Sequence, residues 1–297
     1  MNDIKIGICY YMPEDSYIEN DICLPIQLGY HETKIDLGII KDSTGDNRAL
    51  KHPFYSEYSG IYWIWKNVNA GYKGMFHHRR AFTLENIGIK EKTKYIGRLV
   101  FNYAKNLIKH IPYSYNERIV CHDSSSYMEK LNSFCNILPG ILNGNDIIVP
   151  KPYSFCHISV VEFFDEVVNR VLLEKLKKII KINYPTYYEF FIKTLNGSNL
   201  YYGNLQIMRS NLFDEYCTFV FGVFDNLESE LIGKGYYLDL SQEKVIYRVF
   251  GYIGELLTNT YIIKKKSEKI KIKECTLLFN ASVKGNENIS LDKISLK

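Results

Sequence analysis

The amino-terminal part of the chain alternates in the manner of β-strands and is then interrupted by a polar stretch. "IKIGICY" at 4–10 is rich in β-branched residues and predicts a buried strand, and "LPIQLGY" at 24–30 predicts a second, shorter one. The stretch "KDSTGDNRALKHP" at 41–53 consists mainly of turn-forming and polar residues and predicts a loop.

A helix, a tight turn and a strand are expected after this loop. In "YSEYSGIYWIWKN" at 55–67, apolar side chains fall at 58, 61, 62 and 65, the spacing of an amphipathic helix. "NAG" ends the helix, and "YKGMF" at 72–76 predicts a strand. Two histidines and two arginines, "HHRR" at 77–80, therefore stand at the carboxyl end of a strand, which is where open α/β sheets bind ligands.

The rest of the chain continues in the same alternating way. Strands are predicted at 145–150 and 200–208, and helices at 159–182, 211–231 and 247–262. Residues 83–135 are less regular and rich in basic side chains, and we interpret them as a variable insertion or lid. The tail starts with a basic run, continues with an alternation typical of an edge strand, and ends in polar residues that indicate disorder. The pattern predicts an α/β fold.

Charge and composition narrow the class of protein. The 297 residues include 37 basic and 33 acidic side chains, and the formal net charge of +4 is too small for a protein that binds nucleic acid broadly. No apolar run approaches the roughly twenty residues that cross a bilayer, and the amino terminus lacks a secretion pattern. Seven cysteines without a C-x-x-C pair are typical of reduced core residues. We expect a cytoplasmic protein that is soluble or rests on a membrane surface.

The HHRR sequence has two interpretations from the residues alone. Arg79 and Arg80 could hold a diphosphate, because guanidinium groups pair bidentately with phosphate oxygens and stay charged at cellular pH. Alternatively, one arginine pairs with a helix carboxylate and the other faces solvent, since successive strand residues point to opposite faces. The chain has no D-x-D sequence, so no cofactor is firmly implied; a divalent metal stays open, and without it cationic side chains would have to carry the leaving-group charge.

Several other polar residues have a local structural explanation. Asp46 and Asn47 are of the types that form turns and caps. Glu57 in the first turn of the predicted helix and Lys66 near its end suit the helix dipole. The scattered histidines at 31, 52, 110, 122 and 157 show no metal-like spacing, and we assign them no role.

The segment 44–82 resembles the signature of the DUF4422 family of bacterial capsule and O-antigen glycosyltransferases. The family pattern reads T-G-D-N, then Y-x-E-L-T-x-x-Y-W-x-W-K-N, then Y-x-G-x-x-H-Y-R-R-x-F. The positions in register are Asp46, Asn47, Glu57, Tyr62, Trp63, Trp65, Lys66, Asn67, Gly74, His77, Arg79, Arg80 and Phe82. Tyr58 and His78 replace a Leu and a Tyr of the pattern, and Tyr10 and Tyr11 stand where the family tends to have His-Lys. Weaker similarity extends over most of residues 1–262.

The resemblance implies a GT-A-like fold, in which a Rossmann-type mixed sheet is flanked by helices. Residues 1–262 would form one domain that includes the helical insertion, and 263–297 a basic, partly disordered extension. In such folds HHRR stands where D-x-D usually lies, which implies that His77, Arg79 and Arg80 hold the donor diphosphate. Glu255 occupies the position where such enzymes often keep an acidic base and is the first choice for that role; a glutamate paired with Arg248 is the alternative. The substrate-binding residues implied are Tyr10, Tyr11, Asp46, Asn47, Glu57, Lys66, His78, Asn204 and Arg248.

The function implied is transfer of a sugar from a nucleoside diphosphate donor to a surface glycan in capsule or O-antigen synthesis. The donor would be UDP-linked, with UDP-galactofuranose as the nearest suggestion, and the acceptor a lipid-linked oligosaccharide. A non-catalytic module that binds polyanions or phosphoglycans through the same arginines is the alternative from another class. The basic segments 89–109 and 264–273 could contact anionic lipid at the inner face of the cytoplasmic membrane, although such runs are more often solvated faces.

Overall fold

A computed structural model gives the fold of the chain. It describes residues 3–14, 17–18, 20–89, 92–93, 96–97, 100–101, 104, 113–115, 117–156, 158–164, 168, 170–232 and 248–283. Much of the predicted insertion and the tail from residue 284 onward, where disorder was expected, lie outside these ranges.

A mixed sheet of nine strands forms the centre of the described part of the chain. Its order is β11-β8-β12-β5-β4-β1-β2-β3, with β7 beside β12 and a further pairing of β11 with β4. The strands are β1 Ile4–Tyr10, β2 Cys23–Gln27, β3 Ile40–Lys41, β4 Tyr72–His77, β5 Arg80–Thr83, β7 Arg118–Cys121, β8 Ile147–Pro150, β11 Gln206–Arg209 and β12 Ile272–Asn280. A smaller antiparallel sheet consists of β10 Asn199–Leu200, β9 Tyr153–Cys156 and β6 Tyr113–Tyr115.

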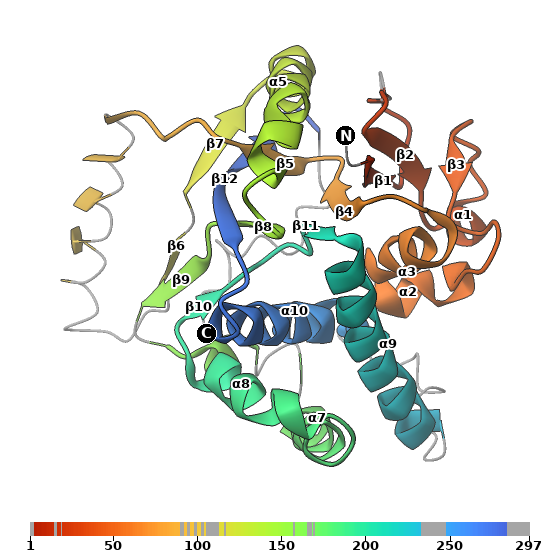
Figure 1. Cartoon of the computed structure of the whole chain (residues 1–297), viewed down its shortest axis with the longest axis vertical. Coiled ribbons are helices and arrows are strands. Elements are labelled where there is room, and N and C mark those ends of the chain that lie inside the picture. Colours follow the sequence, from red (N-terminus) through yellow and green to blue (C-terminus); the bar gives the residue numbers. More distant parts are fainter. Residues whose placement is uncertain are drawn as a thin grey trace.

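Helices cover both faces of the central sheet (Figure 1). They are α1 Tyr30–Thr33, α2 His52–Tyr55, α3 Tyr58–Asn67, α5 Ser124–Leu142, α6 Val160–Phe164, α7 Arg170–Asn183, α8 Pro185–Asn196, α9 Ser210–Ile232 and α10 Val249–Ser267, with a short 3-10 helix at Ala49–Lys51. In Figure 1, α5 lies on one side of the sheet, and α10, α8 and α7 lie on the other. The helix α9 crosses beside α3 on the same side as α10.

Strand β1 shows why the sheet is sandwiched in this way. Ile6 and Ile8 are buried in the core beneath α5, whereas Cys9 belongs to the core shared by α3, α9 and α10. Successive strand residues point to opposite faces, so a strand that is apolar throughout must be covered on both. Each large apolar side chain that is fully buried stabilises the fold by roughly 1.5–3 kcal/mol.

The parallel part of the sheet brings four strand ends to one edge. β1 pairs in parallel with β2 and with β4, and β2 pairs in parallel with β3. The carboxyl ends of these strands therefore meet near Tyr10 and His77. This edge is where the sequence predicted a ligand to bind.

The elements predicted around HHRR are confirmed. Residues 4–10 form β1, 72–77 form β4, and the predicted helix at 55–67 is α3 with the short α2 before it. The long helices at 211–231 and 247–262 are confirmed as α9 and α10, which continue by a few residues.

Two predicted elements are interrupted. The helix expected at 159–182 consists of α6 and α7, and the strand expected at 200–208 breaks into β10 and β11. Between these strands Gly203 and Asn204 have φ angles of 95° and 56°. This left-handed backbone ends a strand, and Gly and Asn are the residues that adopt it most readily.

The tail is not at the edge of the sheet. β12 pairs with β5 and β7 and also with β8, so its position is interior and the edge-strand prediction is wrong. Residues 263–267 continue α10, and the described residues beyond them complete the central sheet. None of the helices in the described ranges is long and apolar enough to cross a membrane.

The close approach of α10 to α3 is a testable requirement of the fold. A Cβ atom on Gly254 would lie 2.1 Å from the ring of Tyr58, so Gly254→Ala forces these helices apart. We expect a loss of about 1–3 kcal/mol in unfolding free energy, measured by urea denaturation. In the control Gly140→Ala, the new Cβ meets no atom within 4 Å and should cost nothing. Equal stability of the two variants would contradict this packing.

Candidate active site

The site begins at the turn between β4 and β5. His77 ends β4 and pairs with Arg80, the first residue of β5, so that His78 and Arg79 form the turn. The two imidazole rings lie 4.0 Å apart between centroids. The His77 side chain faces Glu57 in front of α3, whereas the His78 ring stacks near Tyr10 with centroids 6.1 Å apart.

Glu57 is a buried carboxylate held by the start of α10. The Arg248 guanidinium donates to the Glu57 carboxylate at 3.2 Å and to the Ser56 hydroxyl at 2.8 Å. His77 Nε2 lies 3.8 Å from the same carboxylate oxygen. Burial alone would raise the pKa of Glu57, but the positive charge of Arg248, together with backbone donation and Arg80, outweighs it and lowers the pKa to about 2. Glu57 is therefore ionised at any cellular pH.

Glu255 lies two turns further along α10 and behaves in the opposite way. Its side chain is buried, and one carboxyl oxygen accepts from the Gly203 backbone N–H at 3.2 Å. The other oxygen, Oε2, has no hydrogen-bond partner among the described residues. Burial, and then the negative charge of Glu57, raise the pKa of Glu255 to about 8. Two neighbouring carboxyl groups with widely separated pKa values are typical of acid–base sites.

The pairing of Glu255 with Arg248, which was the alternative from the sequence, is wrong. Arg248 pairs with Glu57 instead, because the left-handed conformation of Arg248, with φ of 72°, starts α10 beside Ser56 and Glu57. Glu255 points instead to the loop that contains Gly203.

Both histidines are neutral in this environment. Burial, and then the charges of His78 and the nearby arginines, lower the pKa of His77 well below its usual value. Burial and the charge of Arg79 lower the pKa of His78 to about 4. The Arg79 backbone N–H donates to His77 Nδ1 at 3.2 Å, which leaves the proton on Nε2, facing Glu57. The permanent positive charges at this edge belong to the arginines.

Arg79 and Arg80 lack the partners that buried charges usually have. No carboxylate of the described residues lies within 4.0 Å of either guanidinium, so the interpretation of a structural salt bridge is not supported there. Arg79 Nε is buried without an acceptor in the described part of the chain, and burial followed by the charge of Arg80 lowers the pKa of Arg79. Arg80 lies over the Tyr202 ring, 5.7 Å from its centroid. Such a pair could bind an anion, since neither side chain meets a carboxylate among the described residues.

A buried hydrogen-bond network holds the loop that precedes β11. The Tyr58 hydroxyl donates to Asn204 Oδ1 at 2.9 Å and lies 2.9 Å from the Thr258 hydroxyl. Tyr216 lies 2.8 Å from Thr258 in the same network. Asn204 is thus a support of the loop that carries Tyr202 and Gly203, and Tyr58, which departs from the family pattern, supplies its hydrogen bond.

Tyr10 and Tyr11 lie on opposite sides of the strand end. The Tyr10 hydroxyl accepts from the Ile18 N–H at 3.4 Å, and its ring faces His78. The Tyr11 ring lies between His52 and His77, with centroid separations of 5.2 and 5.9 Å. Burial and the charge of Glu57 raise the pKa of Tyr11 well above its usual value.

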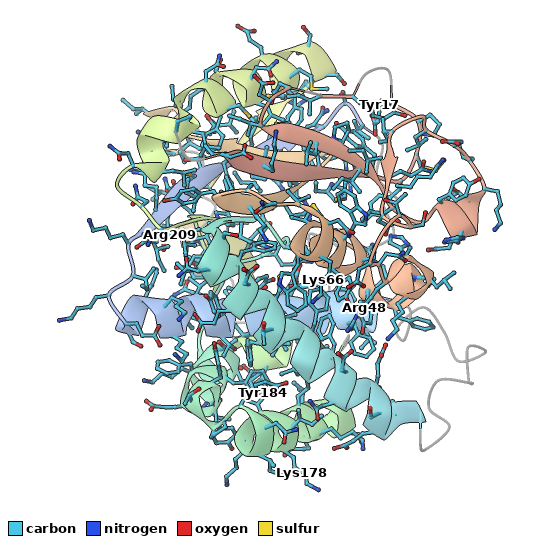
Figure 2. The ribbon with its side chains drawn as sticks, turned by 45° about the vertical axis from the view of Figure 1, so that its right-hand side comes forward. Tyr17, Arg48, Lys66, Lys178, Tyr184 and Arg209 are labelled. Carbon is cyan, nitrogen blue, oxygen red and sulfur yellow. The ribbon has the colours of Figure 1, made fainter. Side chains whose placement is uncertain are left out.

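The structure does not bring Asp46, Asn47 and Lys66 close to Glu57 and His77. They lie at the far end of α3, which at about 1.5 Å per residue is roughly 14 Å from Glu57 along the helix. Asp46 accepts from the Tyr62 hydroxyl at 3.1 Å, and Asn47 donates to backbone carbonyls of its own loop. The Lys66 ammonium lies over the Trp65 ring, and it is labelled with Arg48 in Figure 2; both cations approach the Tyr62 ring. Their role in substrate binding stays a prediction.

Sequence reasoning did not single out Ser56, Tyr202, Gly203 or His52. Ser56 and Tyr202 contact arginines, but nothing in their local sequence indicates this, because both contacts join distant segments. His52 contacts Glu32 through Nδ1, and its ring lies tilted beside that of Tyr11. The positive φ of Gly203 and Asn204 was foreseeable from "YYGN", which is a turn-forming sequence.

Within the described ranges, no group of three or more His, Cys, Asp or Glu side chains is arranged to hold a metal ion. The six cysteines whose side chains are described, at 9, 23, 121, 135, 217 and 275, are free and buried, as predicted for core residues. The ionisable groups at this edge of the sheet are thus the pair Arg79 and Arg80, the ionised Glu57 held by Arg248, and Glu255 with its raised pKa.

A mixed sheet flanked by helices, with two arginines at its strand ends that have no carboxylate partner among the described residues, defines this chain as an α/β protein. Residues 5–266 match the model of a domain of unknown function, DUF4422, and the chain belongs to that family. The solved apo structure of WbbM, a bifunctional glycosyltransferase, superposes with a TM-score of 0.70 at 25% sequence identity. The match covers 94% of this chain but 46% of the WbbM chain, so this protein spans less than half of that neighbour. The expected fold, a mixed sheet flanked by helices as in a glycosyltransferase, is confirmed. A search of curated proteins gave no match.

The pH dependence of stability tests the environment of Glu255. The folded protein keeps the Glu255 proton up to a pKa of about 8, whereas an unfolded chain releases it at about pH 4.3. The folded state therefore binds more protons between these values, and stability falls as pH rises through the window. Glu255→Gln removes that slope, which is at most about 1.4 kcal/mol per pH unit. Urea unfolding of both proteins over this range should show the variant gaining on the wild type; parallel curves would contradict a buried, protonated Glu255.

Proposed function

We propose that this protein is a glycosyltransferase that moves a sugar from a nucleoside diphosphate donor to a hydroxyl group of a glycan. The observation that carries the proposal is the half-buried pair Arg79–Arg80, which stands at the sheet edge without a carboxylate partner in the described part of the chain. Membership of DUF4422 and the likeness to WbbM, a glycosyltransferase, support this choice among phosphate-binding activities.

The arginines act on the leaving group. The bond between the anomeric carbon and the diphosphate oxygen breaks, and the diphosphate takes the electron pair. Arg79 and Arg80 stabilise the charge that develops, since fixed guanidinium groups in a partly desolvated site favour it more strongly than water does. His77 belongs to this assembly as a neutral imidazole that lies beside the arginines and whose Nε2 proton faces Glu57.

Glu255 takes the proton of the acceptor hydroxyl as the new carbon–oxygen bond forms. Its Oε2 is buried and free to accept, while Oε1 is fixed by the Gly203 N–H. A carboxylate with a pKa of about 8 is a stronger base than an ordinary glutamate, although only its ionised fraction can react. Glu57, which Arg248 keeps ionised, orients His77 and raises the pKa of Glu255.

The proposed identities of the donor and of the acceptor follow from the resemblance to the family. We propose a UDP-linked donor, with UDP-galactofuranose as the first candidate, and a lipid-linked acceptor of capsule or O-antigen synthesis. Tyr10, Tyr11, His78, Asn204 and Arg248 would shape the substrate pocket around the reacting groups, and a divalent metal is not required for the steps above. A module that only binds polyanions would account for the arginines, but it would not need the buried carboxyl of Glu255 with its free oxygen.

The arginine assignment predicts a large loss of turnover. Arg80→Ala should lower kcat/KM for release of UDP from UDP-sugars by about 10²–10³, because one donor to the developing charge is lost. Arg209→Ala is the matched control, since Arg209, labelled in Figure 2, pairs with Asp146 and lies opposite Tyr72, at the other end of β4 from His77. The test is a UDP-release assay over a panel of UDP-sugars, with circular dichroism to confirm folding. Wild-type activity in Arg80→Ala would remove the diphosphate assignment.

The base assignment predicts a rate that increases with pH. Since the ionised form of Glu255 appears as pH rises through its pKa of about 8, kcat/KM should rise toward that pH. Glu57, with a pKa of about 2, contributes no limb in this range. A pH–rate profile checks this: Glu255→Gln should lose the rising limb, and a variant that retains it would show that another group takes the proton.

A further inference from the structure

Gly203 lies between two groups that have different tasks in the proposed reaction. Its backbone N–H donates to Glu255 Oε1 at 3.2 Å. A Cβ atom at the same residue would lie 3.5 Å from Arg80 Nη1. One residue thus separates the cation assigned to the leaving diphosphate from the carboxyl group assigned to the acceptor hydroxyl. In the proposed reaction the transferred sugar bridges these two substrate groups, so it belongs beside Gly203.

The backbone of Gly203 keeps this space free of protein. Its φ angle of 95° lies in a region that residues with a side chain rarely adopt. A side chain here would therefore be strained, and its first carbon would already contact the Arg80 guanidinium. Glycine is the residue that proteins use where the backbone approaches a ligand closely. The loop is therefore shaped for a ligand between Arg80 and Glu255.

Tyr202 forms one wall of this space. It directly precedes Gly203, its side chain is partly buried, and the Arg80 guanidinium lies 5.7 Å from the centroid of its ring. The Tyr202 hydroxyl has no hydrogen-bond partner among the described residues. Burial, and then the negative charge that Glu255 carries when ionised, raise the pKa of Tyr202 well above its usual value. Tyr202 therefore lies close to both Arg80 and Glu255.

Tyr252 forms a second wall, from α10. It lies one turn before Glu255 and one turn after Arg248, whose backbone carbonyl accepts from the Tyr252 N–H at 3.3 Å. Residues three or four positions apart share one side of a helix, so Tyr252 stands between these two charged groups. Its side chain is partly buried, and its hydroxyl has no hydrogen-bond partner in the described part of the chain. Burial raises the pKa of Tyr252, while the charges of Arg248 and Glu255 act on it in opposite directions.

Two tyrosines with unused hydroxyl groups suit a carbohydrate. A sugar ring offers C–H groups that pack against an aromatic face and hydroxyl groups that bond to a phenol, and small-molecule sites typically combine aromatic walls with a few polar groups. A nucleobase also stacks on aromatic rings. It lies, however, on the other side of the diphosphate from the reacting carbon, whereas Tyr202 and Tyr252 both lie beside Glu255.

We infer that the sugar of the donor binds beside Gly203, between Arg80 and Glu255, with its ring against Tyr202 and Tyr252 and its hydroxyl groups within reach of the two phenols. This inference rests on the proposed function, because it takes the diphosphate at Arg80 and the base at Glu255 as given. It adds two tyrosines to the site, and these residues select the sugar that fits.

Binding measurements with and without the sugar test this subsite. The probes are UDP, UDP-glucose, UDP-galactopyranose and UDP-galactofuranose, each titrated calorimetrically into the full-length protein without an acceptor. Tyr252→Ala should raise the Kd of the UDP-sugar that the wild type binds most tightly by about tenfold, because a contacting tyrosine is lost. The Kd of UDP should not change, since UDP has no sugar at this position. Tyr252→Phe keeps the ring and should raise the same Kd by only about threefold.

Tyr188→Ala is the matched control. Tyr188 is a partly buried tyrosine of α8 whose ring lies 5.6 Å from the Lys181 ammonium, and its loss should leave every Kd unchanged. Thermal unfolding shows that each variant is folded, and Tyr252→Phe carries the test if Tyr252→Ala is not. Equal weakening of UDP and UDP-sugars, or no weakening of either, would overturn the sugar subsite. A wild type that binds no UDP would contradict the proposed function itself, and the subsite falls with it.

Discussion

The site depends on one constraint, the repulsion between two adjacent guanidinium groups. Neither group has a carboxylate partner among the described residues. Arg79 and Arg80 are held side by side because β4 and β5 form a tight hairpin, and β5 is fixed in turn by β12. Burying such charges without a partner is costly, so the fold must stabilise this edge in its apolar layers. In the proposed function an incoming diphosphate relieves this cost, and this is why we propose the arginine pair as a preorganised anion site rather than as a stabilising element of the sheet.

The chemistry of the two glutamates follows from the same packing. Gly254 lets α10 approach Tyr58 at the start of α3, and this brings Arg248 to Glu57 and Glu255 to the loop of Gly203. Arg248 satisfies Glu57 and keeps it ionised, and the resulting negative charge adds to burial in keeping Glu255 protonated at neutral pH. The start of α3 therefore supplies an ionised carboxylate, Glu57, and α10 supplies both the arginine that keeps it ionised and a second carboxyl group, Glu255, with a raised pKa.

The local sequence pattern predicted the strand and the helix that position Arg79 and Arg80. It did not predict the long-range contacts of the site. The strand at 72–77 and the helix at 58–67 follow from periodicity, so the position of HHRR at a strand end could be predicted. The pairing of Arg248 with Glu57 joins residues 191 apart in sequence, and β12 enters the sheet from the far end of the chain. Such contacts depend on tertiary packing that a local pattern does not encode. Asp46, Asn47 and Lys66 share the family signature with Arg79, yet they lie at the other end of α3, where Asp46 contacts Tyr62 and Lys66 lies over Trp65.

A crystal structure with bound UDP tests the central claim most directly. The account predicts that the two phosphates lie within hydrogen-bond distance of the Arg79 and Arg80 guanidinium groups, on the side of the sheet edge that Glu255 faces. Phosphates bound instead beside Lys66 and Arg48, at the opposite end of α3, with Arg79 and Arg80 left unoccupied, would contradict it.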